Sequence, residues 1–224
     1  MQWLSSDHNR DLRLFHEVTL DILREHHRRK NLLMTAFTIS LEPVIHITDE
    51  QFYQLCRVNP DVKFERSATG ELIVMPPTGG ETGSYNSEIN ADFVIWNRQA
   101  QLGKVFDSST CFKLPKGGDR SPDVAWVALE RWQKLSREQQ RKFPPIAPDF
   151  VLELLSPTDN LEKTQAKMQE YLNSGVGLGW LIDRDNRTVE VYRINQLVEV
   201  LKEPQQLSGE NVLPGFILDL NSVW

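Results

Sequence analysis

The chain has 224 residues, with 25 Lys and Arg against 31 Asp and Glu, which gives a net charge of −6 when His is neutral. This length is enough for one domain with a sizeable core, and 40% hydrophobic residues is ordinary for a globular protein. The negative charge argues against broad, non-specific coating of nucleic acid. It is compatible with a metal-dependent nuclease, because such a site needs carboxylates.

The sequence also argues against membrane and secretory classes. No apolar run approaches the roughly 18 residues that a membrane span needs. Acidic residues recur through the first thirty positions, which is unlike a secretory signal or an acid-poor transit peptide. The cysteines, Cys56 and Cys111, match no metal-ligand spacing and cannot make a disulfide framework. We therefore expect a cytoplasmic protein.

Residues 1–33 differ from the rest and are expected to form a helical extension. Four of the five His lie here, and apolar residues recur at helical spacing over residues 10–30, which predicts an amphipathic helix. The basic stretch 26–30 suits the negative end of a helix dipole. An interaction arm or a His-based metal site is the alternative, although no His pair has a convincing ligand spacing. Met34 is a second candidate for the biological start, because the globular pattern begins just after it.

From residue 35 onward, helical and extended patterns alternate without a long linker or an internal repeat. Thr48 is suited to cap a short helix through Cys56, and residues 67–70 are suited to a hairpin turn. The expected helices are 48–56, 84–102, 130–142 and 161–173, and the expected strands are 62–66, 71–75, 105–114, 123–129, 150–155, 179–183, 188–193, 197–201 and 216–220. This order predicts one α/β or α+β domain over residues 35–224, with a mixed central sheet flanked by helices.

Three charged residues in this domain are candidates for chemistry. Asp123 opens an expected strand, Glu153 lies inside the apolar run 150–155, and Lys167 lies on the helix that follows. A carboxylate among apolar neighbours is costly to bury unless it is paired or bound to metal, and a solvent-facing edge position or a structural Arg partner is the alternative. Two carboxylates on neighbouring strands can hold Mg²⁺ or Mn²⁺, and a lysine beside them can orient the attacking water. The set predicts metal-assisted phosphodiester hydrolysis.

The segment Ser121-Pro122-Asp123, with Glu153 thirty residues later, resembles the PD-(D/E)XK signature of restriction-endonuclease-like nucleases. That signature usually places a lysine two residues after the second acid, where this chain has Leu155. Some members of the superfamily have the lysine on the next helix instead. The resemblance therefore implies Lys167, or Lys163 one turn earlier on the same helix face.

A wider resemblance follows the same order along the chain. The segments 75–83, 120–123, 148–154, 167–171 and 179–183 are similar to those of the Uma family, a bacterial domain of unknown function that is especially numerous in cyanobacteria. The similarity covers residues 35–224 and implies a restriction-endonuclease-like fold with nuclease activity. A helical acid often completes such sites, which implies Glu88, with an exposed helix acid as the alternative interpretation.

Three functions are compatible with these residues. The first is a Mg²⁺- or Mn²⁺-dependent DNA endonuclease in which Asp123 and Glu153 bind the metal, Lys167 positions the water and Glu88 assists. The second is a catalytically silent nucleic-acid-binding or regulatory protein on the same fold, and the third is a phosphohydrolase with a small substrate. The resemblance favours the first. Enzymes with this fold often dimerise, so a homodimer is one candidate assembly.

Overall fold

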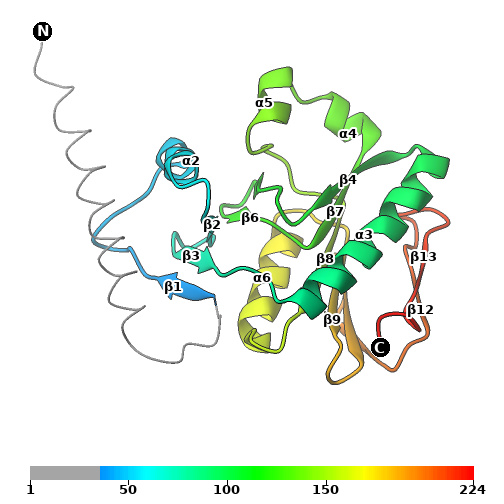
Figure 1. Cartoon of the computed structure of the whole chain (residues 1–224). Coiled ribbons are helices and arrows are strands. Elements are labelled where there is room, and N and C mark those ends of the chain that lie inside the picture. Colours follow the sequence, from blue (N-terminus) through cyan, green and yellow to red (C-terminus); the bar gives the residue numbers. More distant parts are fainter. Residues whose placement is uncertain (1–35) are drawn as a thin grey trace, which may run out of the picture. The chain divides into compact units, whose positions relative to one another are not determined.

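The computed structural model describes residues 36–224, which are built around a six-stranded sheet (Figure 1). Its strands are β4 (Gly103–Asp107), β7 (Val124–Ala128), β8 (Phe150–Leu155), β9 (Leu178–Asp183), β10 (Thr188–Arg193) and β11 (Glu199–Lys202). The order is β11-β10-β9-β8-β7-β4, and only β8 and β9 are parallel among these neighbours. The predicted mixed sheet is confirmed, while the extension predicted over residues 1–33 lies outside the described residues.

Two helices cover the two faces of this sheet. The helix α6 (Leu161–Asn173) connects β8 to β9, as a parallel pair requires, and packs on one face through Met168 and Tyr171. The helix α3 (Gly80–Ala100) packs on the other face through Ile89 and Phe93. Because both faces are covered, β8 and β9 are almost entirely buried. Within residues 36–224, no helix is long and apolar enough to cross a membrane.

A second sheet contains the hairpin that the sequence predicts around residues 67–70. Its strands are β1 (Phe37–Ile39), β2 (Lys63–Arg66), β3 (Leu72–Met75), β5 (Phe112–Lys113) and β6 (Asp119–Arg120), in the order β1-β3-β2-β6-β5. A small third sheet pairs β12 (Gln206–Ser208) with β13 (Ile217–Asp219), and the remaining helices are α2 (Asp49–Val58), α4 (Leu129–Gln133) and α5 (Arg137–Arg141). In α2, Thr48 is the predicted cap and forms a capping box with Gln51.

Two expected elements are each divided in the structure, for local reasons. The strand expected over 105–114 is β4 and β5, because the side chain of Asp107 accepts hydrogen bonds from Ser109 and ends β4 in a turn. The helix expected over 130–142 is α4 and α5, because Ser136 caps a new helix through a capping box. The strands β1, β6 and β12 were not predicted, since two or three residues are too few to show an alternating pattern.

Gly103, the first residue of β4, allows a close approach between two strands of the main sheet. A Cβ atom at this position would lie 2.3 Å from Cε2 of Trp126 and 2.4 Å from the carbonyl oxygen of Val127. We expect Gly103→Ala to lower the free energy of unfolding by about 3 kcal/mol in urea denaturation. Gly83→Ala in α3 is the control, because a Cβ there meets nothing within 4 Å and alanine favours a helix. Equal stability of the two variants would contradict this account of Gly103.

Candidate functional site

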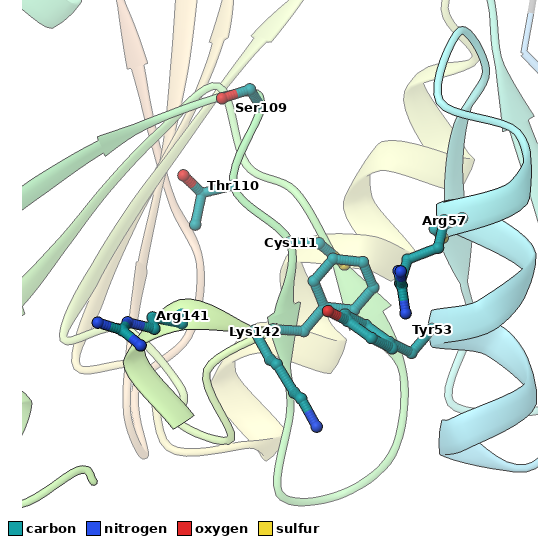
Figure 2. Close-up of a pocket in the computed structure, with 9 residues that line it drawn as sticks. Tyr53, Arg57, Ser109, Thr110, Cys111, Arg141 and Lys142 are labelled. Atoms are coloured by element: carbon teal, nitrogen blue, oxygen red, sulfur yellow. The ribbon is translucent and has the colours of Figure 1, made fainter. Parts of the chain in front are cut away.

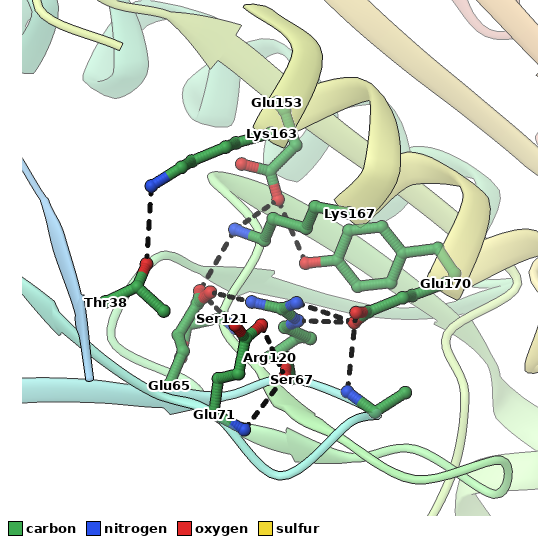
Figure 3. Close-up of polar contacts among 12 residues, drawn as sticks. Thr38, Glu65, Ser67, Glu71, Arg120, Ser121, Glu153, Lys163, Lys167 and Glu170 are labelled. Carbon is green, nitrogen blue, oxygen red and sulfur yellow. Dashed lines mark hydrogen bonds and ion pairs between the residues drawn. The ribbon is translucent and has the colours of Figure 1, made fainter. Parts of the chain in front are cut away.

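Glu153 on β8 points toward α6 and meets Lys167 there (Figure 3). The Nζ atom of Lys167 lies 2.8 Å from Oε1 of Glu153 and 3.0 Å from Oε1 of Glu65. The hydroxyl of Tyr171, one turn after Lys167, donates to the same Oε1 of Glu153 at 2.9 Å. Glu65, Glu153 and Lys167 are 1%, 7% and 9% exposed. The structure thus brings two of the predicted residues together in a buried ion cluster.

Glu65 is the member of this cluster that the sequence analysis missed. It lies on β2, where its Oε1 accepts a hydrogen bond from the backbone N–H of Ser121 and its Oε2 accepts one from Nη1 of Arg120, both at 3.0 Å. Arg120 is also paired with Glu170 of α6 at 2.7 Å. The only sequence signal was the strand pattern 63–66 itself, in which three charged residues surround one phenylalanine. These contacts hold Glu65 and, through it, Lys167 in one position.

Asp123 lies beside Glu153 at the end of the main sheet. The pairing of Val124 with Leu152 continues so that Asp123, just before β7, is opposite Glu153 on β8. The Oδ2 atom of Asp123 accepts a hydrogen bond from the backbone N–H of Leu154 at 2.8 Å. The second predicted carboxylate therefore adjoins the first, on the neighbouring strand.

Of the two lysines that the sequence left open, only Lys167 contacts the acids. Lys163 is exposed, and its Nζ lies 3.5 Å from Oγ1 of Thr38 instead (Figure 3). Leu155, at the position where the signature would place a lysine, packs against the apolar core on the α6 side of the sheet. The geometry favours Lys167 as the lysine of the site.

Glu88 is not brought into the cluster. It is exposed on α3, where its charge acts on Asp92. The side chain of α3 that contacts Asp123 is Asn86, whose Nδ2 donates to Oδ1 of Asp123 at 3.2 Å. Two residues correspond to about 200° of rotation around a helix, so Asn86 and Glu88 face in different directions. The role predicted for Glu88 has no support from this arrangement.

The two glutamates of the cluster have opposite pKa shifts. Burial raises the pKa of Glu153 to about 7, with the charges of Asp123 and Glu65 adding to the effect and Lys167 opposing it. Burial also acts to raise the pKa of Glu65, but the charges of Lys167 and Arg120 outweigh it and lower that pKa to about 2. Burial raises the pKa of Asp123 as well. Glu65 is therefore ionised at neutral pH, whereas Glu153 is the group that gains a proton first as the pH falls.

The raised pKa of Glu153 predicts a pH dependence with a definite sign. The folded protein holds the proton up to about pH 7, whereas the ordinary pKa is 4.5, so the stabilising contribution of Glu153 is complete below about pH 4.5 and is lost as the pH rises to about 7. Protons compete with metal for the same carboxylate, so divalent-metal affinity should increase up to about pH 7 and then level off. Calorimetric titrations with Mn²⁺ and urea unfolding between about pH 5 and 8 would test both trends. Metal affinity that is flat across this range would contradict the assignment.

The donor atoms of the site fit a hard divalent cation. Asp123 and Glu153 offer carboxylate oxygens from adjacent strands, which is the ligand type that Mg²⁺ and Mn²⁺ prefer. Within residues 36–224, no three His, Cys, Asp or Glu side chains are placed to hold a metal together. Two carboxylates are still sufficient for Mg²⁺, which commonly keeps several waters and uses substrate phosphates as further ligands. Asp123 and Glu153 are the residues that would hold the ion.

A separate pocket of about 340 Å³ lies between α2, the turn after β4 and the end of α5 (Figure 2). Its rim includes the cationic side chains of Arg57, Arg141 and Lys142, and the ammonium of Lys142 lies over the ring of Tyr53. Cys111 is a buried lining residue, and burial raises the pKa of its thiol, which disfavours the reactive thiolate. The pocket contains none of the predicted site residues, and its charge suits an anion rather than a metal ion.

Comparison with known proteins agrees with this architecture. Residues 49–221 match the family model described as "Uma2: Putative restriction endonuclease". No curated protein matches the chain. A similar solved structure is that of a putative nuclease belonging to DUF820 from Anabaena variabilis ATCC 29413, with 24% sequence identity, a TM-score of 0.61, and coverage of 71% of this chain and 88% of that chain. At that identity the likeness establishes the fold alone. Because the family model matches most of its length, the chain belongs to the Uma2 family.

Proposed function

We propose that this protein is a divalent-metal-dependent DNA endonuclease of the cytoplasm. The observation that supports this most directly is the meeting of Asp123 and Glu153 on adjacent strands with Lys167, whose Nζ lies 2.8 Å from Glu153. The three residues match the acid, acid and lysine of the family signature in chemistry and in chain order. The family description as a restriction endonuclease supports the same activity.

Each group in the site would have a distinct role in hydrolysis. A divalent ion held by Asp123 and Glu153 would supply the means to lower the pKa of a bound water and to neutralise charge on the phosphate. Burial acts against the charge of Lys167, but Glu153 and Glu65 outweigh it and raise the pKa of the ammonium, so Lys167 stays charged. This ammonium orients the attacking water and stabilises the developing negative charge. Glu65 would hold Lys167 in place through their ion pair, and Tyr171 would hold Glu153 through the hydrogen bond that its hydroxyl donates.

The first experiment compares the cleavage of supercoiled plasmid and of single-stranded DNA with Mg²⁺ or Mn²⁺. We expect Glu153→Ala to lower the cleavage rate by about 100-fold or more, because a metal ligand is lost. Glu162→Ala is the matched control, since Glu162 is an exposed glutamate on the first turn of α6 and should not affect the rate. A wild-type protein that binds metal but cuts neither DNA would overturn the proposal and favour the catalytically silent or small-substrate functions.

The proposed assembly is a homodimer, because two copies of the site related by a two-fold axis would match the two antiparallel strands of a duplex. The chain has a mass of 25.9 kDa, so light scattering on the full-length protein separates a monomer from a dimer directly. A monomer that still makes double-strand breaks would contradict this assembly without affecting the proposed chemistry.

A further inference from the structure

Asn86 is a polar residue on the buried face of α3. The buried residues of this helix are Thr82, Ile89 and Phe93, and Asn86 lies four residues after the first and three before the second. Positions at these spacings share one helix face, which here packs on the main sheet. The amide of Asn86 is therefore directed to the end of β7, where its Nδ2 donates to Oδ1 of Asp123.

The other atom of the same amide has no partner. The Oδ1 atom of Asn86 is buried and accepts no hydrogen bond, a state shared within residues 36–224 only by Oγ of Ser174. Rotating the amide by 180° would not give the oxygen a hydrogen-bond donor, because the oxygen would then face the carboxylate of Asp123. Leaving a buried acceptor unpaired costs about 1–3 kcal/mol, so such an atom calls for a ligand.

The surroundings of this oxygen specify the ligand. It belongs to an amide in contact with Asp123, and the charges that act on Asp123 include the cations Lys167 and Lys63 and the acids Glu153 and Asp159. An amide oxygen is a hard ligand of the same class as a carboxylate oxygen. We infer that Asn86 supplies a third oxygen ligand to the divalent cation held by Asp123 and Glu153, at the position for which the sequence suggested Glu88. This inference rests on the metal dependence proposed above.

Calorimetric titration of the full-length protein with Mn²⁺, without DNA, tests the inference directly. We expect Asn86→Ala to weaken Mn²⁺ binding about 10-fold or more, because one oxygen ligand is lost. Asn86→Asp keeps an oxygen and should bind within about threefold of the wild type or more tightly. Without metal this variant should melt at a lower temperature, because two carboxylates then face each other, and Mn²⁺ should reverse that loss. Glu88→Gln is the matched control and should leave the affinity unchanged.

Three outcomes would overturn the inference while leaving the proposed function intact. The first is an Asn86→Ala variant that binds Mn²⁺ as tightly as the wild type. The second is an equal loss of Mn²⁺ affinity in Asn86→Ala and Asn86→Asp, and the third is a loss of Mn²⁺ affinity in Glu88→Gln. Equal weakening would mean that Asn86 acts only through the N–H that it donates to Asp123. Circular dichroism and thermal melting of each metal-free variant separate loss of ligand from loss of fold. A wild-type protein that binds no Mn²⁺ would instead overturn the proposed function and this inference together.

Discussion

Lys167→Met is expected to lower the rate of DNA cleavage by about 100- to 1,000-fold, the usual effect of removing one preorganised electrostatic group. Methionine retains most of the aliphatic stem but removes the positive charge between Glu153 and Glu65. Breaking a buried ion pair in this way costs about 3–5 kcal/mol of stability. Part of this loss is relieved at lower pH, because Glu153 can take up a proton. Because Lys167 lowers the pKa of Glu153, that pKa is higher still in the variant, so we expect the stability of the variant to keep falling as the pH rises beyond about 7 in urea unfolding.

Lys163→Met provides the matched control for that experiment. Lys163 lies on the same helix one turn earlier but is exposed and contacts Thr38 rather than an acid. The cleavage rate and the free energy of unfolding of Lys163→Met should both stay close to the wild-type values. If Lys163→Met lost activity and Lys167→Met kept it, the assignment of the lysine would be reversed.

Arg120→Met is expected to lower stability about as much as Lys167→Met, because it also breaks a buried ion pair. Arg120 is 5% exposed, and its guanidinium pairs with Glu65 at 3.0 Å and with Glu170 at 2.7 Å. Its removal leaves Glu65 buried with one positive partner fewer, at an expected cost of about 3–5 kcal/mol. Cleavage should also fall, because Glu65 is the second carboxylate that holds Lys167. Urea unfolding and plasmid cleavage on the same preparation measure the two effects.

Arg193→Met is a close comparison for this substitution. Arg193 also pairs with two glutamates, Glu199 and Glu210, but both partners are exposed to solvent. Pairs of this kind contribute about 0–1 kcal/mol, so the variant should unfold almost like the wild type. A loss of stability in Arg193→Met as large as that in Arg120→Met would show that burial is not the source of the effect.

The residues found from the sequence were those with a local signal. Glu153 interrupts an apolar strand, and Lys167 lies on the next helix, so short patterns were enough to find both. Glu65 could not be found in this way, because its partners come from distant segments of the chain that only the fold brings together. Asn86, which we infer to be a metal ligand, lies three residues before Ile89 on the apolar stripe of its helix, whereas Glu88 lies off that stripe.

The fold was predicted best where elements are long and buried. The strand β8, the helix α6 and the strand β9 each lie within one residue of the expected bounds. The two strands are buried on both faces and so show nearly continuous apolar runs, and Asn160 caps the start of α6. Two expected elements, over residues 105–114 and 130–142, are each divided because a side-chain cap or turn ends an element within an otherwise uniform pattern. The spacing of apolar residues along the sequence does not reveal such local hydrogen bonds. Further differences are the short strands β1, β6 and β12, which were not predicted, and the start of α3, which lies at Gly80 rather than at residue 84.

The ion cluster also affects when the protein can act during its synthesis. Its side chains come from β2, β6, β8 and α6, so they extend from Glu65 to Tyr171 along the chain. A growing chain that has not yet released α6 from the ribosome lacks the lysine, and Glu153 then has no counter-charge beside it. Chains that end before Lys167 would therefore lack the complete ion cluster.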